Sequence, residues 1–280
     1  MSVSTQDLAQ ISELVEELCG IVLDSTKGYL VENRFGHMLG EYDCEDYGDL
    51  VKRVRSGGDK KLAGALVNAI TTNETLFFRD QSPYEALRHK VLPELFDAKE
   101  KTPYPQRIRI WSAACSTGQE PYSIAMVLSE LLEDDLPNWD IQILATDICE
   151  DALAQAREGI YGDLEIRRGL STGELNRHFI PEDSNWRIKP ELQKCVRFER
   201  RNLLDPFAAV GRFDVVFCRN VAIYFKQEVR EDLYRRLADR MEVGGYFFTS
   251  SSESLKDIDP RFDPQLHCRS VFYRPAGLPA

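Results

Sequence analysis

The stretch WSAACSTGQEPYSIAM, residues 111–126, decides the fold of this chain. It follows the apolar run Ile108–Trp111, passes through small residues and Gly118, and enters a helical pattern from Glu120 to Leu132. Small side chains at such a turn let a ligand approach the backbone, and the helix start offers free N–H groups to a negative group. The stretch matches neither G-x-G-x-x-G nor the phosphate-binding loop that ends in Gly-Lys-Ser/Thr. By itself it fits both a ligand-binding turn and a plain strand–helix connection.

Short apolar runs alternate with helical patterns on both sides of this turn. Such alternation is typical of parallel strands joined by crossover helices, which form an open α/β sheet. A sheet of this kind binds its ligand at the carboxyl ends of its strands. We therefore expect the chemistry at that edge. The predicted strands are 108–111, 141–146, 196–199, 213–217, 246–249 and 271–273, and the predicted helices between them are 120–132, 151–157 and 227–241, the last of these ending at Gly244-Gly245.

The first hundred residues are predicted to be helical, with no strand pattern before Arg107. Apolar residues recur at steps of three and four from Leu8 to Leu18, which indicates a helix with a stop at Gly20. We divide the chain into a helical domain (1–80), a linker helix and linker (81–106) and an α/β domain (107–280). The linker contains the stiff stretch TPYP at 102–105. The other predicted helices are 27–40, 47–54, 60–71 and 82–98.

Residues 161–195 break the alternation. They are polar and interrupted by glycine and proline, and they are too many for a simple loop in a compact domain. We predict a small inserted subdomain with a few short antiparallel strands.

The composition excludes several classes of protein. The 280 residues include 35 Lys+Arg and 46 Asp+Glu, a net charge of -11, and 43% are hydrophobic. The apolar fraction argues against disorder, and the acidic excess argues against a nucleic-acid partner and against attachment to an anionic membrane. Seven cysteines without a C-x-x-C pair are interpreted as small buried residues in a reducing compartment. No signal peptide or membrane-spanning run is found, so we expect a cytoplasmic protein.

Polar residues follow the predicted strands at the edge where a ligand is expected. Asp147 follows the second strand, where an acidic residue of a nucleoside-binding sheet accepts hydrogen bonds from ribose hydroxyls. The alternative role for Asp147 is a cap of the next helix. Arg219 and Asn220 follow the strand at 213–217. The stretch TTNETLFFRD at 71–80 mixes polar and aromatic residues outside the helical stripes, and we interpret it as a site loop.

Five stretches make the chain resemble the chemotaxis receptor methyltransferases of the CheR type. The resemblance covers nearly the whole chain and implies a Rossmann-like methyltransferase sheet with an all-helical N-terminal domain and an antiparallel β-subdomain insertion. It implies S-adenosylmethionine as cofactor, and methyl esterification of glutamate side chains on bacterial chemoreceptors as reaction. The stretches are TTNETLFFRD (71–80), WSAACSTGQEPYSIAM (111–126), ATDI (145–148), RRNLLDPF (200–207) and FDVVFCRNVAIYF (213–225).

The resemblance also implies the residues of the site. Arg79 is expected to pair with a carboxylate of the cofactor or the substrate, and Tyr224 to lie near the methyl group and orient the substrate. The structural alternatives are an ordinary ion pair for Arg79 and a core tyrosine for Tyr224. No metal is expected. The expected cofactor contacts are Asn73, Thr75, Arg79, Glu120, Asp147, Asn202, Leu203, Arg219 and Asn220, with Asn202 and Leu203 at the adenine.

The expected reaction needs few catalytic groups. A glutamate side chain is already ionised at pH 7, so its methylation requires no general base. Alignment of the carboxylate with an activated methyl group can supply several kcal/mol. The sequence agrees, because no catalytic triad is visible and none of the four histidines lies in the five stretches.

Two partner predictions concern the receptor. A basic face of the helical domain is predicted to meet the acidic methylation helices, although a solvated charged face explains the pattern equally well. Some family members grip a receptor C-terminal pentapeptide through a glycine-rich loop of the β-subdomain. The corresponding stretch at 177–188 is short and lacks those glycines, so we predict that the pentapeptide is not bound. The candidate docking residues are Arg34, Lys52, Arg53 and Arg55.

Other functions remain as alternatives. One is a cofactor-binding scaffold without transfer activity, and another is a methyltransferase for a receptor of a pathway other than motility. A nucleic-acid methyltransferase is disfavoured, since no Asn/Asp-Pro-Pro-Tyr motif is present and the net charge is acidic. A nicotinamide dehydrogenase is disfavoured because the double-glycine fingerprint is absent.

Overall fold

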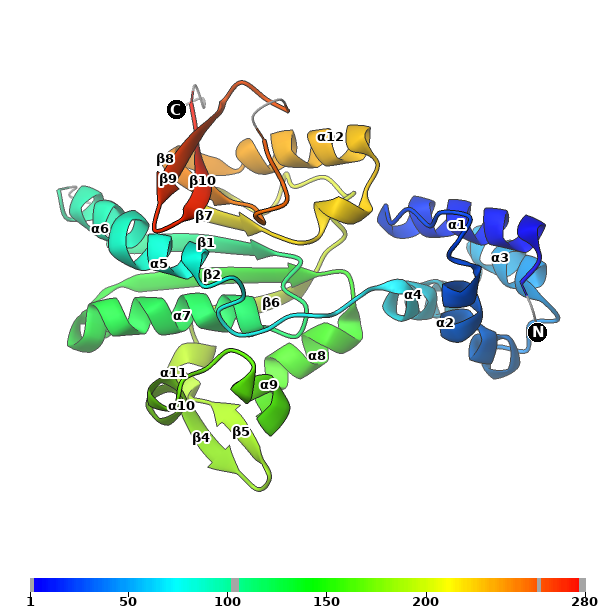
Figure 1. Cartoon of the computed structure of the whole chain (residues 1–280), viewed down its shortest axis with the longest axis horizontal. Coiled ribbons are helices and arrows are strands. Elements are labelled where there is room, and N and C mark those ends of the chain that lie inside the picture. Colours follow the sequence, from blue (N-terminus) through cyan, green and yellow to red (C-terminus); the bar gives the residue numbers. More distant parts are fainter. Residues whose placement is uncertain (1–2, 102–105, 256–257, 277–280) are drawn as a thin grey trace.

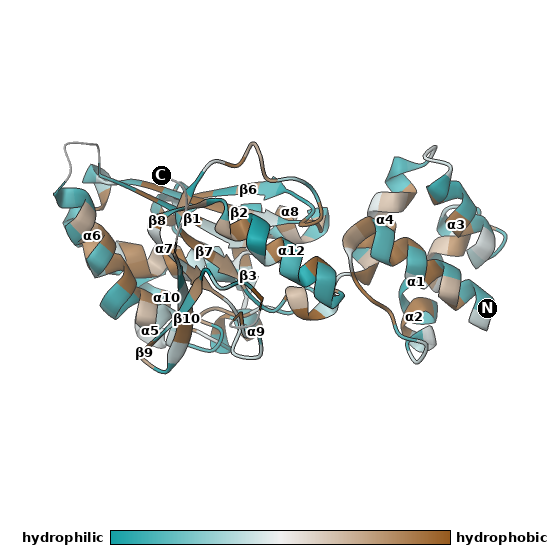
Figure 2. Cartoon of the chain, turned by 90° about the horizontal axis from the view of Figure 1, so that it is seen from above, coloured by the Kyte–Doolittle hydropathy of each residue, from teal (hydrophilic) through white to brown (hydrophobic). Residues whose placement is uncertain are grey.

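The structure, a computed structural model, describes residues 3–101, 106–255 and 258–276. Figure 1 shows a group of helices at one end of the molecule and a sheet covered by helices at the other. The view from above in Figure 2 shows the same separation into two parts. The predicted TPYP linker lies outside the described residues. Among those that are described, no helix combines the length and apolarity needed to cross a membrane.

Four helices form the N-terminal domain around one apolar core. The first begins with a capping box between Ser4 and Asp7 and ends at Gly20, whose φ of 78° provides a left-handed cap. The predicted stop at Gly20 is therefore confirmed. Asp46 and Asp59 cap the third and fourth helices by accepting backbone N–H groups. The helices are α1 (Thr5–Cys19), α2 (Gly28–Glu41), α3 (Tyr47–Arg55) and α4 (Lys60–Ile70).

The predicted helix at 82–98 contains a break. It consists of α5 (Ser82–Ala86), a π-helical turn (Leu87–Val91) and α6 (Leu92–Glu100). Pro93 lies at the start of α6, where it has no N–H to donate and its ring crowds the preceding turn. The N–H of Leu92 accordingly bonds to the carbonyl of Leu87, five residues back.

A seven-stranded sheet in the order β6-β2-β1-β7-β8-β10-β9 forms the second domain. The first five of these strands are parallel, whereas β10 and β9 are antiparallel additions at one edge. The chain runs outward from β1 in one direction and from β7 in the other, so the topological switch lies between these strands. The strands are β1 (Arg107–Ala113), β2 (Asp140–Asp147), β6 (Val196–Arg200), β7 (Phe213–Cys218), β8 (Met241–Phe248), β9 (Phe262–His267) and β10 (Ser270–Pro275).

Helices cover both faces of the sheet (Figure 1). The linker helix α6 and helix α7 (Gln119–Leu132) pack on one face, and α12 (Gln227–Ala238) packs on the other. Helix α8 (Glu150–Glu158) connects β2 to the insertion. The predicted helix end at 241–245 is wrong, because Met241 begins β8 and both glycines lie inside that strand. Strand β9 was not predicted, since Pro264 and its polar neighbours suit only an edge strand.

The insertion is a small antiparallel sheet in the order β3-β5-β4, as predicted. Its two longer strands are joined by a two-residue turn, Asp183-Ser184. Three short helices in the insertion were not predicted, because each is too brief to show an apolar period. The elements are β3 (Ile160–Gly162), α9 (Asp163–Arg167), α10 (Thr172–His178), β4 (Phe179–Glu182), β5 (Asn185–Ile188) and α11 (Pro190–Gln193).

Candidate functional site

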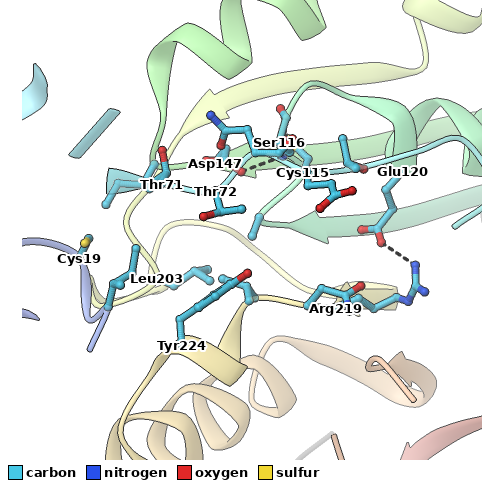
Figure 3. Close-up of a pocket in the computed structure, with 18 of the residues that line it drawn as sticks. Cys19, Thr71, Thr72, Cys115, Ser116, Glu120, Asp147, Leu203, Arg219 and Tyr224 are labelled. Atoms are coloured by element: carbon cyan, nitrogen blue, oxygen red, sulfur yellow. Dashed lines mark hydrogen bonds and ion pairs between the residues drawn. The ribbon is translucent and has the colours of Figure 1, made fainter. Parts of the chain in front are cut away.

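A cleft lies at the carboxyl ends of the central strands, where the helical domain meets the sheet (Figure 3). Every residue predicted to contact the cofactor lines it, and so does Tyr224. The fold thus brings together side chains from five separate stretches of sequence. The residues that line the cleft and were expected at the site are Asn73, Thr75, Arg79, Glu120, Asp147, Asn202, Leu203, Arg219, Asn220 and Tyr224.

The turn between β1 and α7 has an unusual backbone. Ala114 and Ser116 adopt φ values of 66° and 51°, and Gly118 adopts 94°. Such left-handed conformations in non-glycine residues carry strain and cluster at ligand sites. A Cβ atom on Gly118 would lie 2.9 Å from the Cβ of Ala156 and from the hydroxyl of Tyr161, so only glycine fits there. The small residues of the quoted stretch therefore serve both the turn and the cleft.

Asp147 ends β2 with its carboxylate at the cleft. Its Oδ2 accepts the N–H of Ser116 at 2.7 Å, and its Oδ1 accepts the N–H of Cys149 at 2.9 Å. Burial raises the pKa of Asp147 above its ordinary value, although both backbone hydrogen bonds oppose the shift. Each carboxylate oxygen keeps a further lone pair, so the group can still accept hydrogen bonds from a ligand.

Glu120 and Arg219 form a buried ion pair across the switch point (Figure 3). Oε2 of Glu120 lies 3.2 Å from Nη1 of Arg219, and its Oε1 accepts the hydroxyl of Ser112 at 2.7 Å. Nη2 of Arg219 contacts Asp80 at 2.7 Å and donates to the carbonyl of Arg79 at 3.1 Å. Burial raises the pKa of Glu120, while Arg219 acts in the opposite direction. The pair joins α7, β7 and the 71–80 loop into one wall of the cleft.

The 71–80 loop reaches the cleft in a strained conformation. Phe78 and Asp80 have φ values of 50° and 68°. The carbonyl of Asn73 accepts the Ser116 hydroxyl at 2.9 Å, which ties this loop to the β1–α7 turn. Nη1 of half-buried Arg79 donates to the carbonyl of Glu74 at 3.0 Å. That bond occupies one arm of the guanidinium and leaves its other donors for a ligand.

Asn202 connects the cleft to the helical domain. Its Nδ2 donates to the carbonyl of Leu18 at 2.8 Å, and its Oδ1 accepts the N–H of Leu204 at 3.0 Å. The amide is thus largely occupied within the protein. The next residue, buried Leu203, presents an apolar side chain to the cleft.

Tyr224 lies in a 3₁₀ turn (Ala222–Tyr224) after β7. Its ring points into the cleft in Figure 3, and the residue is 39% exposed. No group among the described residues forms a hydrogen bond with its hydroxyl. The alternative of a core tyrosine does not fit this exposure.

The comparisons with known proteins show the family of this chain. The family model for the CheR methyltransferase all-alpha domain matches residues 6–71, and the model for the SAM binding domain matches residues 73–269. The chain belongs to the CheR methyltransferase family. This CheR-family chain is 40% identical over 279 residues to Chemotaxis protein methyltransferase 1 of Pseudomonas aeruginosa, covering 98% of this chain and 99% of that protein. It is 40% identical to Chemotaxis protein methyltransferase Cher2 of Pseudomonas putida over 94% of this chain and 95% of that protein. It is 33% identical to the Escherichia coli chemotaxis protein methyltransferase over 94% of this chain and 89% of that protein.

S-adenosylmethionine is the cofactor of this CheR-family methyltransferase, and the residues of the cleft fit it. Asp147 has spare acceptors for hydroxyl groups, and the strained turn of small residues admits a ligand close to the backbone. The buried Nε of Arg219 has no partner among the described residues, so the wall holds an unsatisfied donor. When bound, the cofactor supplies an activated methyl group on a sulfonium centre.

Several residues that line the cleft of this CheR-family chain were not predicted from the sequence. Cys19 and Ile21 come from the helical domain and line the cleft only because the two domains meet there. No local pattern signals such a contact. Cys115 and Ser116, in contrast, lie inside the 111–126 stretch, where the run of small residues between strand and helix could have indicated them.

Three of the four candidate docking residues have partners within the helical domain. Nη1 of Arg34 donates to the carbonyls of residues 69–71 at the end of α4. Arg53 pairs with Asp59 at 3.3 Å. Arg55 pairs with Glu13 at 2.8 Å and with Glu17 at 2.9 Å, both on α1. Lys52 is exposed and forms no ion pair with the described part of the chain.

Proposed function

We propose that this methyltransferase transfers the methyl group to glutamate side-chain carboxylates of chemoreceptors and forms glutamyl methyl esters. The observation that carries the proposal is a cleft that offers positioning groups and no free general base. None of its described lining residues is a histidine. Its buried carboxylates, Glu120 and Asp147, are already hydrogen bonded, and the exposed carboxylate of Glu74, which also lines the cleft, pairs with Arg168 at 3.0 Å. A carboxylate acceptor suits such a site, since it needs no deprotonation at pH 7, whereas an amine or a hydroxyl does.

The proposed roles follow from the contacts. Asp147 accepts hydrogen bonds from the ribose hydroxyls, and Leu203 packs against the adenine. Arg79 uses its remaining donors for a carboxylate. Tyr224 donates its hydroxyl to the substrate carboxylate and holds it for in-line attack.

The remaining expected contacts have supporting parts in the proposal. Glu120 and Arg219 fix the wall that faces the cofactor, through a pair that lies 3.2 Å apart. Asn73 and Thr75 line the cleft from the 71–80 loop. Asn220 follows Arg219 directly. Asn202 orders the loop that carries Leu203, since its amide bonds to Leu18 and Leu204.

The proposed substrate is a methylation helix in the cytoplasmic part of a receptor, so the proposal includes a cytoplasmic location. Such helices are acidic around their target glutamates, and they require a local basic surface on an acidic enzyme. We assign this role first to Lys52, because Arg34, Arg53 and Arg55 are engaged within the domain.

The test is transfer of a tritiated methyl group to membranes that carry chemoreceptors. The proposal expects a labelled receptor whose label is released by mild base, as an ester requires. Base-stable label would overturn the carboxylate assignment. Binding of S-adenosylhomocysteine without any transfer would favour the scaffold alternative instead.

Two Tyr→Phe variants, compared with each other, test the role of Tyr224. Tyr224→Phe is expected to lower kcat about tenfold, with the affinity for S-adenosylhomocysteine within about twofold, because one substrate hydrogen bond is lost. Tyr246→Phe is the matched control, since the Tyr246 hydroxyl donates to Glu94, outside the cleft. Equal kcat values for the two variants would remove Tyr224 from the proposed mechanism.

A further inference from the structure

Glu253 is a buried carboxylate behind the cleft. It follows β8 in the loop from Thr249 to Leu255, and only 8% of its surface is exposed. It does not line the cleft. No lysine or arginine among the described residues forms an ion pair with it. A buried carboxylate is costly unless it is well hydrogen bonded, so its contacts show what it stabilises.

Four donors converge on this carboxylate. Oε1 accepts the hydroxyl of Tyr234, from α12, at 2.8 Å. Oε2 accepts the N–H and the hydroxyl of Ser250 at 3.2 Å and 2.5 Å. Oε2 also accepts the backbone N–H of Asn220 at 3.3 Å. The first three contacts hold the carboxylate in place, and the fourth extends from it to the cleft.

The contact with Asn220 stabilises a strained residue. Asn220 has a φ of 58°, in the left-handed region that non-glycine residues seldom adopt. It follows Arg219, which pairs with Glu120, and it precedes the turn that carries Tyr224. A hydrogen bond to its N–H fixes the peptide plane on which that φ depends. The loop thus leaves β7 in a direction that places Arg219 and Tyr224 at the cleft.

We propose that Glu253 is a positioning residue that holds the Arg219–Tyr224 loop in its cofactor-binding conformation. It acts through the backbone of Asn220 and touches neither cofactor nor substrate. The proposal rests on the assignment of the cleft to S-adenosylmethionine and extends it to a residue outside the cleft. It implies that the loop after β8 sets the affinity for the cofactor.

Glu253→Gln is the informative variant, because it keeps the shape and removes the charge. Its amide can place an acceptor oxygen at only one of the two carboxylate positions, and every hydrogen bond that it accepts loses the negative charge of the acceptor. Tyr234→Phe is the matched control, since among the residues that the structure describes it removes the one donor to Oε1 and leaves the contact with Asn220. Both variants alter one buried network and are expected to lower the thermal midpoint.

The two variants are expected to differ in cofactor binding, measured by calorimetry with S-adenosylhomocysteine. Glu253→Gln should weaken the affinity about tenfold or more, as the loss of a hydrogen bond to a charged group predicts. Tyr234→Phe should remain within about twofold of the unmodified protein. Wild-type affinity in a folded Glu253→Gln variant would overturn the proposal, and so would an equal loss in both variants.

A replacement variant and a measurement on the unmodified protein complete the experiment. If Glu253→Gln does not fold, Glu253→Asp keeps the charge but withdraws the carboxylate from the N–H of Asn220, and it should weaken binding in the same direction; unchanged binding would then count against Glu253. Failure of the unmodified protein to bind S-adenosylhomocysteine would instead reject the assignment of the cleft.

Discussion

The backbone N–H of Val22 donates a 2.9 Å hydrogen bond to the carbonyl oxygen of Tyr224. The segment after α1 is therefore bonded to the turn that carries the proposed substrate-orienting tyrosine. Nearby, Nζ of Lys226 pairs with Glu16 on α1 at 2.5 Å. Together with the bond from Asn202 to the Leu18 carbonyl, these contacts join the end of α1 to two loops of the cleft. The helical domain thus helps to fix the geometry of the site.

Gly20→Ala tests this junction. Gly20 has a φ of 78°, and an added Cβ would lie 3.1 Å from Leu204 and 3.2 Å from Phe225. The left-handed backbone conformation costs an alanine about 1–2 kcal/mol, and the added Cβ requires the side chains of Leu204 and Phe225 to shift. We expect a fall of the thermal midpoint by at least about 2–4 °C and weaker binding of S-adenosylhomocysteine.

Gly57→Ala is the control for Gly20→Ala. Gly57 has a similar φ of 70°, but an added Cβ would meet nothing within 4 Å. This variant should show the backbone strain alone and keep the cofactor affinity. The same loss of affinity in both variants would contradict a role of the junction in the site.

The attachment of the inserted subdomain is expected to depend on pH. Buried His178 of α10 lies 2.9 Å from Glu130 of α7, which also accepts a hydrogen bond from Arg88. Burial lowers the pKa of His178, and it outweighs the opposing effect of Glu130. The unfolded chain therefore takes up this proton first as the pH falls through about 6.5, so the free energy of unfolding decreases below that pH. The other charged groups that act on His178 are those of Arg177 and Lys189.

Thermal unfolding at pH 7.5 and pH 5.5 checks this dependence. The His178 contribution is about 1.4 kcal/mol per pH unit at most, which corresponds to a few °C in the thermal midpoint. His178→Gln should reduce the difference between the two midpoints. His89→Gln is the control, because His89 is exposed on the linker helix and lies beside Glu85, away from Glu130. An undiminished difference in His178→Gln would show that other groups control the response.

Much of the fold could be predicted because it depends on local periodicity. The apolar stripe from Leu8 to Leu18 and the apolar runs of the central strands are set by burial on one or both faces. The π-helical turn at Leu87–Val91 was not predictable from that period, since it results from Pro93 within an otherwise regular pattern. Strand β9 was missed because an edge strand needs little apolar surface.

The site residues likewise divide into those that a local sequence pattern could predict and those that it could not. Asp147 ends β2, and Arg219 and Tyr224 follow β7, so their positions come directly from the topology. Ile21 and Glu253 reach the site region through packing between distant segments, which no local pattern records. The pairing of Arg55 with Glu13 likewise depends on the packing of α3 against α1, and it changes which basic residue is the best docking candidate.

Lys52→Glu tests the docking proposal. If Lys52 attracts an acidic receptor helix, reversal of its charge should lower the rate of receptor methylation several-fold at low salt and much less at high salt, because exposed charges are screened. Lys194→Glu, an equally exposed change next to α11, is the control. Both variants should bind S-adenosylhomocysteine normally. Unchanged rates at low salt in Lys52→Glu would exclude this face.

The last prediction is that the receptor C-terminal pentapeptide is not bound. The β4–β5 connection is the two-residue turn Asp183-Ser184, which has no glycine and little room to surround a peptide. Pro181 removes one backbone donor from β4, an edge strand of the insertion, and so weakens this edge for an added strand. The carboxylate of Glu182, at the end of β4, already accepts hydrogen bonds from Nε and Nη2 of Arg187.

Calorimetry with the pentapeptide should therefore show no heat of binding, while S-adenosylhomocysteine added to the same sample should bind and show that the protein is folded. Micromolar affinity for the peptide would contradict the prediction. A receptor that lacks its last five residues should be methylated at a rate within about twofold of the intact receptor, because its helix reaches the enzyme through the charged and cleft-facing surfaces alone. A large loss of rate on truncation would mean that a tether is used after all, by a surface other than the β4–β5 turn.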